Sequence, residues 1–145
     1  MCLSETWLRP DELDIPLNIL TQKFGVDDVS VYSKSGMTSV DADYSGRPFG
    51  GVSILFKHKS NLFCHELPVQ SDRIIAIAVT NSNGDILDII VCVYMPFYDR
   101  SKPNQTEEFI TTLDTLQAFI DEHGSSAPIK FFGDWNVPLP KSNRI

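Results

Sequence analysis

Residues 73–94 read RIIAIAVTNSNGDILDIIVCVY, and this stretch determines the predicted fold. Its first part, Arg73 to Thr80, is rich in Ile, Ala and Val and predicts a strand. The polar segment from Asn81 to Asp85 predicts a turn of the hairpin kind. Ile86 to Tyr94 is apolar except for Asp88, as expected of a strand that is covered on both faces.

Two helices are predicted on either side of this hairpin. Apolar residues recur on one face of Gln105 to His123, which predicts an amphipathic helix. Asn104 and Glu107 fit a capping box at its start, and Gly124 fits a stop at its end. A shorter helix is expected after Pro16, because apolar residues continue at helical spacing as far as residue 24.

The rest of the chain predicts short strands and one long loop. Residues 35–48 are rich in turn-forming residues and predict the loop. A short buried strand is expected at residues 129–132, and further strands at residues 2–4, 29–32, 52–56 and 62–67. About seven strands and two helices indicate a mixed α/β fold of the α+β kind.

Length, charge and cysteine content limit the possible classes of protein. A chain of 145 residues predicts one domain. The three cysteines show no paired or metal-binding spacing, which argues against a disulfide scaffold or a zinc site. No apolar run is long enough to span a bilayer, so we expect an intracellular protein that does not contact a membrane.

The charge distribution lacks the usual mark of a nucleic-acid-binding protein. The net charge is −7, and residues 1–72 and 73–145 are both mildly acidic, with no basic arm or stripe. If the substrate carries phosphates, a bound divalent cation or residues outside this chain must offset the repulsion.

Polar residues follow three of the predicted strands. They are Glu5 after residues 2–4, Tyr94 after residues 89–93, and Asp134 with Asn136 after residues 129–132. Taken singly, each is typical of an ordinary surface or turn residue. If the strands are neighbours, however, Glu5, Asp134 and Asn136 supply the carboxylate and amide oxygens that Mg²⁺ prefers.

Four segments in order resemble one superfamily. They are SETWL (4–8), GRPFGGVSIL (46–55), VYMP (93–96) and GDWNV (133–137). Together they resemble the endonuclease/exonuclease/phosphatase superfamily, and within it the endonuclease domain of non-long-terminal-repeat retrotransposons. The resemblance covers nearly the whole chain. It implies part of a four-layer, two-sheet sandwich flanked by helices.

The resemblance also implies an activity, a cofactor and partners. Residues 1–145 would form a partial Mg²⁺-dependent DNA endonuclease domain, a phosphodiester hydrolase that could use Mn²⁺ in place of Mg²⁺. Glu5 would ligate the metal, and Tyr94 would contact the scissile phosphate. Asp134 would orient or deprotonate the attacking water, and Asn136 would help to hold that water or the metal. DNA would be the substrate, a reverse transcriptase domain would belong to the same polyprotein, and the site of action on genomic DNA would be the nucleus.

The chain departs from the family pattern at both ends. The family places an Asn on the strand before Glu5, and a further Asp-bearing strand and a Ser-Asp-His motif after the Asn136 position. None of these is present in this sequence. We therefore expect a fragment in which the second half of the sandwich is incomplete and which is inactive alone. Two alternatives stay open: the same fold acting on a phosphoinositide, sphingomyelin or RNA, and a non-catalytic binding remnant.

Overall fold

The computed structural model describes residues 1–25, 28–37, 49–99 and 101–136, and these contain the expected seven strands and two helices. Most of the predicted loop 35–48 lies outside the described residues. In chain order the elements are β1 (Cys2–Ser4), α1 (Ile15–Phe24), β2 (Val29–Lys34), β3 (Val52–Lys57), β4 (Phe63–Leu67), β5 (Ile74–Thr80), β6 (Ile86–Tyr94), α2 (Pro103–His123) and β7 (Ile129–Asp134).

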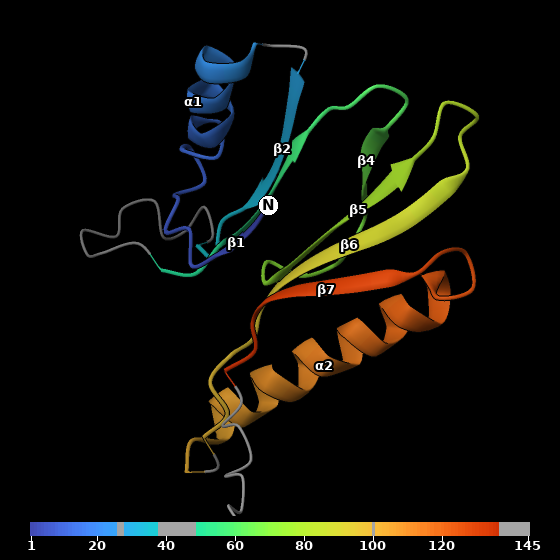
Figure 1. The fold of residues 1–145 in the computed structure, drawn as a ribbon. Coiled ribbons are helices and arrows are strands. Elements are labelled where there is room, and N and C mark those ends of the chain that lie inside the picture. The colour runs from blue at the N-terminus through green and yellow to red at the C-terminus, as the bar shows by residue number, and fades with distance from the viewer. Residues whose placement is uncertain (26–27, 38–48, 100, 137–145) are drawn as a thin grey trace, which may run out of the picture.

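The strands form two sheets, as Figure 1 shows. The first has the order β1-β3-β2 and is antiparallel throughout. The second has the order β4-β5-β6-β7, in which β5 and β6 form the predicted hairpin. Among the strands of the described residues, only β6 and β7 run parallel, with α2 as the connection between them. The two sheets and their helices confirm the predicted α+β class.

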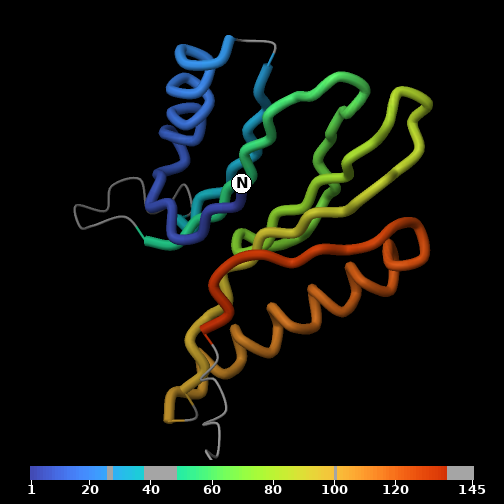
Figure 2. The backbone as a smooth tube through the Cα atoms, in the orientation of Figure 1, coloured from blue at the N-terminus to red at the C-terminus, as the bar shows by residue number. Residues whose placement is uncertain are grey.

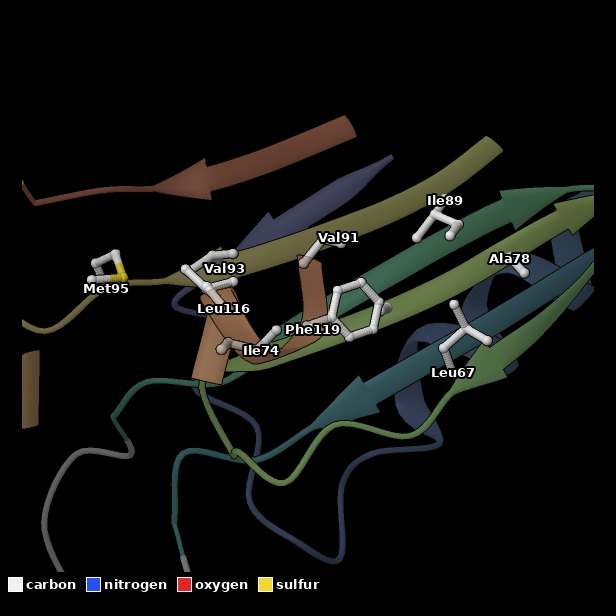
Figure 3. Packing of buried hydrophobic residues seen from close by; sticks show 10 residues of the cluster. Leu67, Ile74, Ala78, Ile89, Val91, Val93, Met95, Leu116 and Phe119 are labelled. Carbon is white, nitrogen blue, oxygen red and sulfur yellow. The ribbon is translucent and has the colours of Figure 1, made fainter. Parts of the chain in front are cut away.

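Two hydrophobic clusters lie on opposite faces of the hairpin. Because side chains alternate along a strand, β5 and β6 send one set toward β3 and the other toward α2. Ile75, Ile77 and Cys92 pack with the first sheet, whereas Ile74, Val91 and Val93 pack with Leu116 and Phe119 of α2 (Figure 3). The prediction that this strand is covered on both faces is confirmed for residues 89–93, whereas Leu87 near its start is exposed.

The tube in Figure 2 shows the resulting order of layers. Helix α1 lies against the first sheet, the second sheet follows, and α2 covers its other face. Strand β7 is less buried than predicted, because it lies at the margin of the second sheet in the described residues. Phe132, expected in a buried strand, has 47% of its surface exposed.

The helices confirm the sequence prediction except at their ends. α1 begins at Ile15, so Pro16 lies in its first turn, where a missing N–H costs no hydrogen bond. α2 likewise begins at Pro103, with Lys102 as its N-cap and no side-chain cap. The predicted capping box of Asn104 and Glu107 is therefore wrong, because Asn104 already lies inside the helix.

The end of α2 also differs from the expected stop. Gly124 is the C-cap, but it keeps a right-handed φ of −63°, and its N–H donates to the carbonyl of Ile120 at 2.8 Å. The chain therefore leaves the helix without the left-handed turn that glycine commonly supplies. Among the described residues, neither helix has the length and apolarity needed to cross a membrane.

Candidate active site

Glu5 follows β1 and is held in an uncommon backbone conformation. Its φ is +53°, in the left-handed region that non-glycine residues rarely adopt. The backbone after it is anchored to the start of β3, because the N–H groups of Thr6 and Trp7 donate to the carbonyls of Gly51 (3.3 Å) and Gly50 (2.9 Å). Backbone strain of this kind costs of order 1–3 kcal/mol and is concentrated at functional sites. The anchored turn presents the Glu5 side chain to solvent.

Tyr94 ends β6 and reaches Glu5 from the other sheet. Its hydroxyl donates to Oε1 of Glu5 at 2.8 Å. Partial burial raises the pKa of Tyr94 to about 12, and the neighbouring Glu5 carboxylate adds to the rise. At neutral pH the phenol is therefore protonated and can donate a hydrogen bond to an anionic group.

Asp134 ends β7 directly beside Tyr94. The parallel register pairs Tyr94 with Asp134, and the N–H of Met95 donates to the Asp134 carbonyl at 2.8 Å. Gly133 permits this close fit, since its φ is +132° and a Cβ there would overlap the carbonyl oxygen of Val93. The carboxyl ends of two adjacent parallel strands thus carry a phenol and a carboxylate side by side.

Asn136 folds back onto the same strand ends. Its side-chain Nδ2 donates to the Met95 carbonyl at 2.8 Å, and its backbone N–H donates to Oδ1 of Asp134 at 3.0 Å. Its φ of +46° is left-handed, as is that of Glu5. These bonds hold the side-chain amide against the strand. The amide oxygen is then the atom that can accept a hydrogen bond or bind a metal ion.

Arg73 is a member of this cluster that the sequence did not indicate as functional. Its guanidinium carbon lies 5.3 Å from the centre of the Tyr94 ring, and its carbonyl accepts the N–H of Tyr94 at 2.9 Å. The predicted hairpin contained a signal for it. With a turn at residues 81–85, Ile74 pairs with Val93, so Arg73 lies opposite Tyr94. Arg73 and Tyr94 also line a small pocket of about 100 Å³ with Gly50 and Gly51.

Gly50 and Gly51 have a structural role beside this cluster. Their carbonyls hold the segment after β1, and a Cβ on Gly50 would lie 3.8 Å from Cε1 of Tyr94. The pair therefore lets the β3 backbone approach both Glu5's segment and the Tyr94 ring.

The oxygen donors suit a hard divalent cation in their chemistry. Glu5 and Asp134 supply carboxylates and Asn136 an amide oxygen, and Mg²⁺ is commonly bound by one or two carboxylates with water and phosphate completing its shell. Within the described residues, no three His, Cys, Asp or Glu side chains gather tightly enough to hold a metal by themselves. A bound cation would thus depend on water and substrate for most of its ligands.

Comparison with known proteins bears on the fold. The sequence matches no protein-family model and no curated protein. Among solved structures, the chain is similar to the human Nocturnin catalytic domain, solved with a bound sulfate anion, with a TM-score of 0.54 at 16% sequence identity. This similarity supports the predicted fold of two sheets flanked by helices.

The match covers a larger share of this chain than of the Nocturnin chain. The match covers 94% of this chain and 51% of the Nocturnin chain, so the chain spans about half the length of that neighbour. At 16% identity the similarity shows the shared fold alone. The structure brings Glu5, Tyr94, Asp134 and Asn136 to one end of this fold, and their roles stay predictions.

Proposed function

We propose that the chain is a phosphodiesterase domain that hydrolyses DNA with the help of Mg²⁺, of the kind found in retrotransposon polyproteins. The observation that carries the proposal is the hydrogen bond from Tyr94 to Glu5, formed across the two sheets beside Asp134. The endonuclease/exonuclease/phosphatase-type fold supports a phosphoester substrate, and the four sequence segments support the retrotransposon subgroup.

Each side chain has a role that its contacts allow. Glu5 is exposed and can hold a divalent cation, which when bound neutralises charge on the scissile phosphate. The neutral Tyr94 phenol can turn its donor from Glu5 to a phosphate oxygen and stabilise charge as it develops there. Asp134 accepts the proton of the attacking water, and Asn136 keeps that carboxylate oriented.

The bond changes follow from these roles. Water attacks phosphorus while one of its protons passes to Asp134, and the bond from phosphorus to the 3′ oxygen breaks. The 3′ oxygen leaves with the bonding electrons and takes up a proton from solvent. The products are a 3′-hydroxyl and a 5′-phosphate, and the former can prime a reverse transcriptase in the same polyprotein. On this proposal the domain acts on genomic DNA in the nucleus.

The test is a nicking assay on supercoiled plasmid. We expect conversion to open circles that requires Mg²⁺ or Mn²⁺, stops with chelator and is lost in Asp134→Ala. Asp114→Ala is the matched control, because Asp114 is an exposed carboxylate on α2 away from the strand ends. The sequence predicts that these 145 residues are inactive alone, so this expectation applies to a longer reading frame that contains them, and the 145 residues are assayed beside it. Nicking that persists in Asp134→Ala would contradict the proposal.

One observation favours a second candidate, a phosphoester with an apolar substituent. Glu5 lies on the rim of an apolar groove of about 420 Å³ between α1 and the first sheet, and Leu3, Leu8, Ile19 and Leu55 are among its lining residues. A panel of sphingomyelin, a phosphoinositide, RNA and DNA distinguishes the candidates. Hydrolysis of a lipid substrate at a higher kcat/KM than DNA would replace the first proposal by the second.

A further inference from the structure

The Tyr94 ring is fixed by contacts that are separate from its bond to Glu5. The backbone of Gly50 faces the ring edge, since a Cβ there would lie 3.8 Å from Cε1. The Arg73 guanidinium lies over the ring at 5.3 Å from its centre, within the range of a cation–π contact. The ring therefore meets the first sheet through Gly50 and its own sheet through Arg73.

Arg73 is in turn held by helix α2. Its Nη2 lies 2.6 Å from Oε1 of Glu108, and its Nε donates to the same oxygen at 2.8 Å. The Arg73 side chain is 24% exposed and the Glu108 side chain 49%, so Arg73 is the better buried partner of the ion pair. Two guanidinium nitrogens on one carboxylate oxygen fix the plane of the guanidinium as well as its position.

Arg73 also contacts Tyr94 through the backbone. The N–H of Tyr94 donates to the Arg73 carbonyl at 2.9 Å, at the end of the antiparallel ladder between β5 and β6. One residue thus fixes both the backbone and the ring of Tyr94. This is the geometry expected of a residue that orients another side chain.

We propose that Arg73 is a positioning residue which, tied to Glu108 of α2, holds the Tyr94 ring so that its hydroxyl stays on Glu5. The consequence for catalysis rests on the proposed function, whereas the positioning itself does not. Helix α2 is thereby connected to the candidate active site through the Arg73 side chain. A lysine at this position would keep the charge but lose the planar contact with the ring.

The test follows the Tyr94 ring directly by NMR on the whole chain labelled with ring-¹³C tyrosine. The sequence holds four tyrosines, and Tyr94→Phe assigns the signal of interest. We expect Arg73→Met to shift that signal and to raise the ring-flip rate roughly two- to fivefold, because the loss of a partly exposed cation–π contact corresponds to a factor of about that size. Arg73→Lys restores only part of the effect, because the charge remains without the planar surface.

Glu108 supplies the second arm of the test. Glu108→Gln leaves a half-exposed polar side chain in place and is expected to fold. It therefore tests the positioning role even if Arg73→Met fails to fold. It should shift the Tyr94 signal in the same direction, and the double variant should add little to Arg73→Met alone. Lys130→Met is the matched control, because it breaks the ion pair with Asp88 (2.7 Å) on the same sheet, away from Tyr94.

The outcomes separate the two proposals. An unchanged Tyr94 signal in folded Arg73→Met and Glu108→Gln overturns the positioning role, whatever the enzyme does. An equal shift in Lys130→Met also overturns it, since the effect is then a general response of the sheet. If the signal responds as expected but no phosphoester is hydrolysed, the positioning role stands and the proposed function fails. Where activity is measured, Arg73→Met should lower kcat more than it raises KM.

Discussion

Gly133 lies so close to Val93 that a single methyl group at this glycine would overlap the Val93 carbonyl oxygen. The contact joins the two parallel strands one residue before Tyr94 and Asp134, which end β6 and β7. The pairing of phenol and carboxylate thus depends on a residue that has no side chain of its own.

Gly133→Ala should therefore destabilise the protein by about 3 kcal/mol or more, since it combines a positive φ with a backbone clash. Urea unfolding followed by circular dichroism measures the change. Gly84→Ala is the control: its φ is also positive, but nothing lies within 4 Å of its Cβ position, so a cost of only about 1 kcal/mol is expected. Equal losses in the two variants would show that the clash is relieved at little cost.

Removal of the Tyr94 hydroxyl should reduce activity with little effect on stability. In an active form of the domain, Tyr94→Phe is expected to lower kcat roughly 100-fold, as for other single donors to a developing oxyanion. The measurement is single-turnover nicking with saturating metal. Tyr98→Phe is the comparison, because Tyr98 packs against Phe109 at the start of α2. A rate within a factor of two of the parent would exclude Tyr94 as a phosphate contact.

Metal binding should depend on Glu5. Titration calorimetry with Mn²⁺ is expected to show binding to the parent chain and an affinity at least tenfold weaker in Glu5→Gln. Glu12→Gln is the matched control, because Glu12 accepts the N–H of Arg9 at 2.9 Å and lies outside the strand-end cluster. An equal loss of affinity in both variants would indicate a general effect of negative charge rather than a site at Glu5.

Tyr32 should make stability fall in alkaline solution. Its hydroxyl donates to the Cys64 carbonyl at 3.2 Å, and burial raises its pKa from 10.0 to about 12. Between these values the unfolded chain loses the phenol proton while the folded chain keeps it, so stability is fully present below pH 10 and is lost as the pH rises toward 12. Urea midpoints of the parent should fall more steeply over this range than those of Tyr32→Phe; parallel curves would contradict the prediction.

The packing between α2 and the second sheet gives a stability prediction of its own. Phe119 is 4% exposed within the cluster that contains Val91 and Val93. Phe119→Ala should cost about 3–5 kcal/mol in urea unfolding. Ile110→Ala, on the same helix but 50% exposed, should cost less than about 1 kcal/mol. Similar losses at both positions would mean that α2 packs with a different face.

The sequence predicted the elements of the fold well because their signals are local. The Ile, Ala and Val content of 73–80, the polar turn after it and the apolar run over 86–94 identified the hairpin, and one apolar face identified α2. The ends of the helices were harder to predict. At α2 the proline at position 103 starts the helix without a side-chain cap, so the more general preference for Asn104 as a cap gave the wrong boundary.

The candidate site was predictable only in part. The sequence placed Glu5, Tyr94, Asp134 and Asn136 at the ends of predicted strands, and the order of four segments pointed to them together. Arg73 was not identified, because its contacts join residues far apart in the sequence: Tyr94 lies 21 positions away and Glu108 lies 35 positions away. The left-handed backbone at Glu5 and Asn136 was likewise not predicted, since it accompanies hydrogen bonds between residues far apart in the sequence.

The hairpin turn from Asn81 to Asp85 lies at the far end of β6 from Tyr94, a strand length of roughly 25 Å away. It is closed by its own bonds, among them Asn81 Nδ2 to Asp85 Oδ2 at 2.9 Å, and its tip is exposed. A fluorophore, an affinity tag or a short inserted peptide placed at Ser82 or Asn83 would thus leave the strand ends that carry the polar cluster undisturbed. The turn is the natural handle by which this protein can be immobilised or tracked while the polar cluster at its opposite end stays accessible.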